Sequence, residues 1–117
     1  MDAEQTCLGR RVKRGDVYWC DLDKKRPVVI LTRDGLIPHL SNVSVAPLST
    51  RIRGIRSQVI LETFDGIAER SAISLDNIQT VPKDSLQGLI VSLTRTRLRE
   101  LQRAVIFALE LDVFDDE

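Results

Sequence analysis

The fold is decided by two neighbouring runs, Arg14-Gly15-Asp16-Val17-Tyr18-Trp19-Cys20-Asp21-Leu22 and Arg26-Pro27-Val28-Val29-Ile30-Leu31-Thr32. The first run is rich in strand-forming residues and predicts a strand over residues 16–22. Its apolar side chains alternate between two faces, so both faces need at least partial cover. The second run is apolar and β-branched over residues 27–31, which is typical of a buried strand that Pro27 can only open. A connector of three residues joins the two runs.

Five more short strands are predicted downstream, separated by turn-forming residues, at residues 42–46, 58–61, 72–75, 78–81 and 89–91. Short strands at this spacing indicate a strongly bent antiparallel sheet or a small barrel. Only the end of the chain has a helical pattern, with Thr94 or Thr96 as N-cap and apolar residues recurring every three or four positions from Leu98 to Leu111. The acidic residues 112–117 follow at the negative end of the helix dipole, so this tail is expected to fray.

Composition indicates one globular domain, since 117 residues with 43% hydrophobic and 29% charged residues suffice for one core. Residues 1–11 show no periodicity and are expected to form a flexible leader before a single domain over residues 12–117. Lys and Arg balance Asp and Glu, but residues 1–60 carry eleven basic and six acidic side chains, and residues 61–117 carry the reverse. This split is compatible with a positive face for a polyanion, or with charges that merely cluster on solvated loops.

Several classes of site are excluded by the sequence. No window matches a membrane span and no apolar segment marks a signal peptide, which predicts a cytoplasmic protein. Cys7 and Cys20 are too few for a zinc site, and Cys20 is expected to be a buried, inert thiol. Glycine-rich phosphate loops and serine nucleophile elbows are missing, and the acidic tail lacks the fixed geometry that magnesium needs. We therefore expect no metal and no cofactor.

The residues left for chemistry are an arginine-rich set with a hydroxyl pair: Arg26, Ser49, Thr50, Arg51, Arg53 and Arg56, together with His39. Arginine suits phosphate chemistry because its planar fork donates two hydrogen bonds and keeps its charge. Taken alone, Arg26 is equally compatible with a surface arginine before a proline, and Ser49 and Thr50 with local backbone hydrogen bonds.

Four segments in order resemble the MazF/PemK (Kid-like) toxins of bacterial toxin–antitoxin pairs. They are the Arg-Gly-Asp-Val-Tyr-Trp run with Asp21-Leu22, the Arg26-Pro27 run, Val45-Ala46-Pro47-Leu48-Ser49-Thr50, and Ser74-Leu75-Asp76-Asn77-Ile78-Gln79-Thr80-Val81. The likeness covers residues 12 to 112. It implies an α+β, mainly β fold, an SH3-like β-barrel with a C-terminal helix, that works as a homodimer.

The resemblance also implies a sequence-specific, metal-independent endoribonuclease that cuts single-stranded RNA and inhibits growth. The family's catalytic arginine maps to Arg26, and its threonine maps to Ser49, with Thr50 beside it. The implied reaction is attack of the ribose 2′-oxygen on phosphorus, which leaves a cyclic phosphate and a 5′-hydroxyl. The short connector before Arg26 leaves the general base open, with Asp21 and Asp23 as the nearest carboxylates and His39 as the only imidazole.

Further contacts to RNA are expected from His39, Arg51, Arg53, Asp76 and Asn77. For His39 the alternative is an exposed bystander, and for Asp76 and Asn77 a hydrogen-bonded turn. Tyr18 and Trp19 are expected in the core or a dimer contact. A cognate MazE-like antitoxin, acidic and partly disordered, is the expected protein partner. Two rival functions are a CcdB-like toxin that binds gyrase without cutting anything, and an SH3-like protein-interaction module.

Overall fold

A computed structural model describes residues 12–111 and contains seven strands, four short 3-10 helices and one long helix in that range. The strands are β1 (Asp16–Asp21), β2 (Lys25–Ile30), β3 (Asn42–Ser49), β4 (Gln58–Leu61), β5 (Ser71–Ser74), β6 (Gln79–Pro82) and β7 (Leu86–Ser92). The 3-10 helices are η1 (Ile37–His39), η2 (Thr63–Asp65), η3 (Leu75–Asn77) and η4 (Lys83–Ser85), and the long helix is α2 (Arg95–Leu109). The expected leader, Cys7 and the frayed acidic tail lie outside the described residues.

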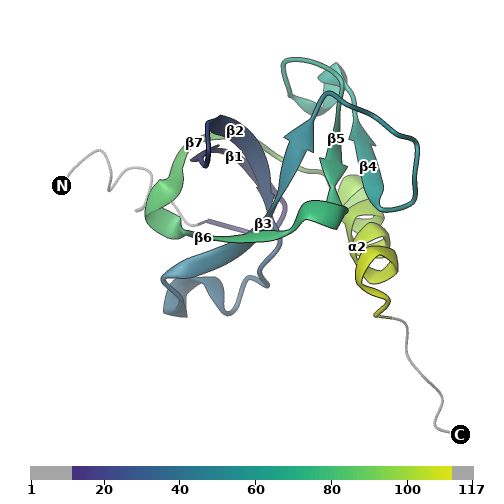
Figure 1. The fold of residues 1–117 in the computed structure, drawn as a ribbon. Helices are drawn as coiled ribbons and strands as arrows, with labels where there is room; N and C mark the ends of the chain where they lie inside the picture. Colours follow the sequence, from purple (N-terminus) through teal and green to yellow (C-terminus); the bar gives the residue numbers. More distant parts are fainter. Residues whose placement is uncertain (1–11, 112–117) are drawn as a thin grey trace, which may run out of the picture.

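The strands form one bent antiparallel sheet in the order β4-β5-β3-β2-β1-β7, with β6 paired to β3. β3 makes the bend because residues 42–45 pair with β6 whereas Leu48 and Ser49 pair with β5. In Figure 1, β3 runs from one half of the molecule into the other. The first and last strands of this order do not pair, so the predicted α+β, mainly β fold is confirmed while the sheet stays open rather than closing into a barrel.

The bend buries both faces of the central strands. Val17, Val29 and Leu48 pack with Leu101 and Ala104 of α2, while Tyr18, Cys20, Val28, Val43 and Val45 pack in a second cluster on the other face. This agrees with the expectation that both faces need cover. Cys20 is fully buried, as predicted.

One expectation about this region is wrong. Pro27 is the third residue of β2 rather than its first, which is possible because β2 pairs there with β1 alone and pairs with β3 only from Val28 onward. Of the two aromatic residues expected in the core or a dimer contact, Tyr18 is fully buried, whereas Trp19 keeps 39% of its surface exposed, which leaves the dimer contact as its expected place.

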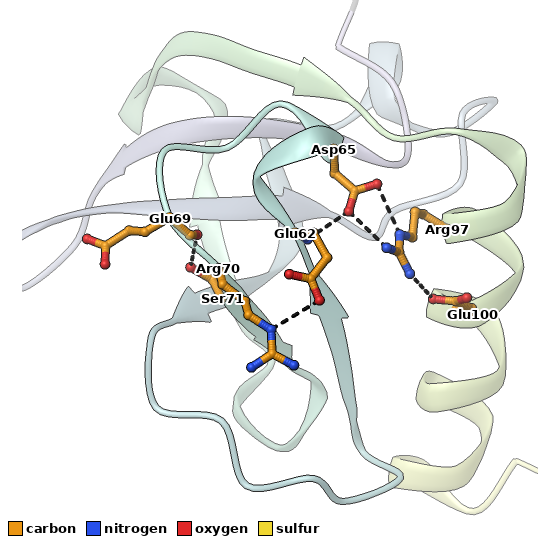
Figure 2. Close-up of polar contacts among 7 residues, drawn as sticks. All are labelled: Glu62, Asp65, Glu69, Arg70, Ser71, Arg97 and Glu100. Atoms are coloured by element: carbon orange, nitrogen blue, oxygen red, sulfur yellow. Dashed lines mark hydrogen bonds and ion pairs between the residues drawn. The ribbon is translucent and has the colours of Figure 1, made fainter.

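The start of α2 is fixed by its cap and by an ion pair to η2 (Figure 2). The Thr94 side chain accepts a hydrogen bond from the Arg97 backbone, which selects Thr94 over Thr96 as N-cap. Arg97 donates to both carboxylate oxygens of Asp65, from Nε at 3.1 Å and Nη2 at 2.9 Å, and Nη1 donates to Glu100 at 2.9 Å. The backbone N–H of Glu62 also donates to Asp65. The Asp65 side chain is only 7% exposed, so this pair ties the helix to the loop after β4.

We expect Arg97→Met to lower the free energy of unfolding by about 2–4 kcal/mol at pH 7, because it leaves a nearly buried carboxylate without its cation. Hydrogen bonds from Arg97 and, to a lesser extent, from the Glu62 backbone hold the pKa of Asp65 below its usual value. That stabilisation is present above the unfolded pKa of about 3.9 and is lost as pH falls through the lower folded value. Urea unfolding at pH 7 and pH 3 should therefore show a difference between wild type and variant that shrinks in acid.

Arg99→Met is the matched control, since Arg99 lies exposed on the same helix. An equal loss of stability in both variants, or a difference that does not change between the two pH values, would contradict this account of Asp65.

Candidate active site

A cavity of about 520 Å³ lies beside β3, at the end of the molecule where β3 ends and β2 begins. Its lining is Leu22, Asp23, Arg26, Pro47, Leu48, Ser49, Arg51, Arg53, Gln58, Ser74, Asp76, Asn77 and Gln79. Because β3 lies between β2 on one edge and β5 and β6 on the other, side chains from distant parts of the sequence meet here.

Arg26 is the second residue of β2 and enters the cavity from that strand, where it pairs with Cys20 of β1. Its Nε donates to Oδ1 of Asp23 at 3.3 Å, and its side chain is 35% exposed. The hydrogen bond from Arg26 holds the pKa of Asp23 below its usual value, so this carboxylate is ionised at neutral pH. The two terminal nitrogens of Arg26 have no protein partner within residues 12–111, which leaves one edge of the fork available to an anion.

Ser49 is the last residue of β3 and presents its hydroxyl to the same cavity. Its Oγ accepts a hydrogen bond from the backbone N–H of Arg51 at 3.1 Å, which orients the oxygen and leaves its hydrogen free to donate. Thr50 follows the strand and lines a different cavity, together with Trp19, Pro27 and Ile67. The opposite placement follows from the alternation of side chains along an extended chain.

The segment after β3 adds cations to the cavity through Arg51 and Arg53. Gln58 fixes this segment, because its Oε1 accepts from the backbone N–H of Arg53 at 2.8 Å and its Nε2 donates to the carbonyl of Arg51 at 3.3 Å. Arg56 does not line the cavity. Its guanidinium lies over Phe107 of α2, 4.3 Å from the centre of the ring. Three arginines and one oriented hydroxyl therefore surround a space that can hold a phosphate.

η3 and β6 supply another part of the lining, where Asp76, Asn77 and Gln79 face the cavity. Ser57 is 4% exposed, and its hydroxyl donates to Oδ2 of Asp76 at 2.9 Å. Its carbonyl accepts from the backbone N–H of Leu75 at 2.9 Å, so η3 is fixed to the start of β4 at two points.

Comparison with known proteins places this chain in one family. Residues 13–109 match the family described as PemK-like, MazF-like toxin of type II toxin–antitoxin system. The chain belongs to this family. Similar curated relatives from Mycobacterium tuberculosis are endoribonuclease MazF3, 40% identical over 82% of this chain and 93% of the relative, and probable endoribonuclease MazF5, 42% identical over 86% and 91%.

Solved structures of similar fold indicate the same family as the sequence relatives of this PemK/MazF family member. The M. tuberculosis toxin MazF-mt6 superposes with a TM-score of 0.79 at 39% identity, covering 84% of this chain and 99% of that chain. An endoribonuclease from a mycobacterial species, solved in complex with its cognate antitoxin, superposes with a TM-score of 0.80 at 28% identity, covering 87% and 98%.

The cavity gathers six of the eight residues expected from the sequence: Arg26, Ser49, Arg51, Arg53, Asp76 and Asn77. Thr50 lines the neighbouring cavity instead. His39 is exposed at the end of η1 and does not line the cavity. Between residues 12 and 111 no group of three His, Cys, Asp or Glu side chains is placed to hold a metal ion, and no helix there is long and apolar enough to cross a membrane.

Sequence reasoning missed Ser57, Gln58, Ser74 and Gln79. In the sequence they are ordinary polar residues in or beside short strands. Only the pairing of β4 with β5 and of β6 with β3 brings Gln58, Ser74 and Gln79 to the cavity, and brings Ser57 into contact with Asp76. A signal for Gln58 was the cluster of arginines before it, since a loop with that much positive charge needs side-chain contacts to hold its shape.

Proposed function

We propose that this toxin is a sequence-specific, metal-independent endoribonuclease that cuts single-stranded RNA at the cavity around Arg26. The observation that carries the proposal is the convergence of Arg26, Arg51 and Arg53 with the Ser49 hydroxyl. Family membership supports it, and similar relatives are endoribonucleases.

The proposed step is an internal transfer at phosphorus. The 2′-oxygen of the nucleotide before the cut loses its proton and forms a bond to phosphorus, while the bond from phosphorus to the 5′-oxygen breaks. The leaving oxygen takes up a proton, so the products are a 2′,3′-cyclic phosphate and a 5′-hydroxyl. Negative charge builds on the non-bridging oxygens, and a fixed guanidinium that opposes this charge lowers the barrier.

Arg26 is the catalytic residue in this proposal, and Ser49 donates a hydrogen bond to the same phosphate. Arg51 and Arg53 attract the RNA backbone and neutralise neighbouring phosphates. The carboxylate that contacts Arg26 is Asp23, which makes it the candidate to take the 2′-proton. Asp23 is kept ionised by Arg26, which makes it able to accept a proton but a weak base.

A homodimer and a cognate antitoxin complete the proposal. Exposed apolar side chains on α2, just after it, and on the segment before β4 suit contact with a second copy; they are Ile55, Phe107, Leu109 and Leu111. A related mycobacterial endoribonuclease is solved in complex with its antitoxin. An acidic antitoxin segment would compete with RNA for the arginines of the cavity. Because RNA is the proposed substrate, we also predict a cytoplasmic location.

Incubating the purified protein with a long unstructured RNA in EDTA tests the proposal against its rivals. Defined cleavage sites are expected from the endoribonuclease. A CcdB-like gyrase inhibitor or an SH3-like interaction module would leave the RNA intact, and either result would overturn the proposal. Inhibition of gyrase by the same preparation would then separate those two rivals.

Ser49→Ala is expected to slow cleavage by about 10²-fold, because it removes a hydrogen bond to the charged phosphate, whereas Thr50→Ala should change the rate less than about threefold. The contrast follows from their placement in two different cavities. Single-turnover rates on one RNA measure both effects. A larger loss in Thr50→Ala would show that the reacting phosphate lies on the other side of the strand end.

A further inference from the structure

The cavity lining combines cations with a carboxylate and amides. β2 and the segment after β3 contribute Arg26, Arg51 and Arg53 to its lining, whereas η3 and β6 contribute the Asp76 carboxylate with the amides of Asn77 and Gln79, here called the Asp76 wall. A site for a polyanion gains nothing from a carboxylate that faces phosphate, because like charges at close range repel. Asp76 therefore calls for a part of the RNA that offers hydrogen-bond donors.

The Asp76 carboxylate is held in a fixed orientation. The Ser57 hydroxyl that donates to its Oδ2 is buried, and the adjacent backbone of Leu75 is bound by the carbonyl of Ser57. Oδ1 has no protein partner in the described part of the chain. One oxygen is thus fixed by the protein while the other is left to accept from a ligand.

Single-stranded RNA offers two kinds of donor to this oxygen, the ribose 2′-hydroxyls and the nucleobases, and only the bases carry sequence information. Proteins that read single-stranded RNA take unstacked bases and hydrogen-bond to their Watson–Crick edges, and carboxylates accept from the amino group of cytosine. Adenine and guanine also carry amino groups. Uracil has no amino group, and its one donor on that edge, the N3 imino group, lies between two carbonyl oxygens that the carboxylate would repel. Amides such as Asn77 and Gln79 both donate and accept, so they can satisfy the rest of a base edge.

We propose that the Asp76 wall binds a nucleobase beside the cleaved phosphate and rejects uracil there, with Ser57 as the positioning residue for Asp76. This inference rests on the proposed nuclease function and names the residues that select the RNA sequence to be cleaved. The base contact and the phosphate contact lie in one cavity, so base choice is coupled directly to cleavage.

The test maps 5′-hydroxyl ends produced from a randomised single-stranded RNA by wild type, Asp76→Asn, Ser57→Ala and the control Asp84→Asn. Asp84 is exposed on η4 and outside the cavity. Wild type and Asp84→Asn should share one position next to the cut where uracil is depleted by about 5- to 100-fold, the discrimination that one good base contact provides. Asp76→Asn should remove most of this depletion, and Ser57→Ala should reduce it, while cleavage at the best sites continues.

Each other outcome is informative. A variant with the wild-type thermal midpoint and an unchanged base profile would overturn the inference while leaving the nuclease function in place. An unchanged profile combined with weaker antitoxin binding would assign the wall to a protein contact instead. If wild type cleaves no RNA, the proposed function and this inference fail together. If Asp76→Asn does not fold, Gln79→Leu repeats the test on the same wall and should alter the profile at the same position.

Discussion

Arg26→Ala is expected to lower the rate of RNA cleavage by about 10²–10³-fold while the protein stays folded. The guanidinium is the part of the cavity that best opposes charge on the phosphate, because it enters from a rigid strand and keeps its terminal nitrogens free of protein partners among residues 12–111. Its contact to Asp23 contributes little stability, since the Asp23 side chain is 73% exposed. Single-turnover cleavage and thermal unfolding measure the two parts of the prediction.

Two matched variants make the Arg26 result specific. Arg26→Lys keeps the charge but loses the planar fork, so it should fall between wild type and Arg26→Ala. Arg33→Ala removes an exposed arginine outside the cavity and should cleave like wild type. A folded Arg26→Ala protein with unaltered cleavage would remove Arg26 from the mechanism.

A substrate with deoxyribose at the nucleotide before the cut should resist cleavage at that linkage, with a rate below detection, because the 2′-oxygen is the nucleophile. Its binding should change little, since Arg51 and Arg53 contact the backbone through charge. The measurement compares matched RNA oligonucleotides that differ at this one position.

The same oligonucleotide with deoxyribose two nucleotides away is the control and should be cut normally. Cutting at the modified linkage would mean that an activated water attacks the phosphorus. The 2′-oxygen would then not be the nucleophile.

Much of the fold follows from apolar alternation in the sequence. The strand expected at residues 58–61 agrees with β4, and the helix begins at one of the two predicted caps. β3 extends three residues past its predicted end. A proline usually ends a strand, but Pro47 lies inside β3, opposite Val28 of β2. Local signals of this kind do not show whether the missing N–H of a proline faces a partner.

The site was predictable only in part, because its residues come from four separate stretches of sequence, residues 22–26, 47–53, 58 and 74–79. Arg26 and Ser49 follow from the order of motifs, whereas the choice between Ser49 and Thr50 needed the register of β3. The roles of Ser57 and Gln58 depend on the pairing of β4 with β5, which no short-range pattern specifies. The exposure of Trp19 was equally hidden, since an aromatic residue in an apolar run usually packs inside.

The end groups of the cut RNA test the central claim most directly. RNA digested in EDTA can be treated with polynucleotide kinase and labelled phosphate, with and without prior phosphatase. The account predicts that the new 5′ ends accept label without phosphatase, since they are hydroxyls, and that the matching 3′ ends are cyclic phosphates. New 5′ ends that need phosphatase before they can be labelled would be phosphates, and they would contradict attack by the 2′-oxygen.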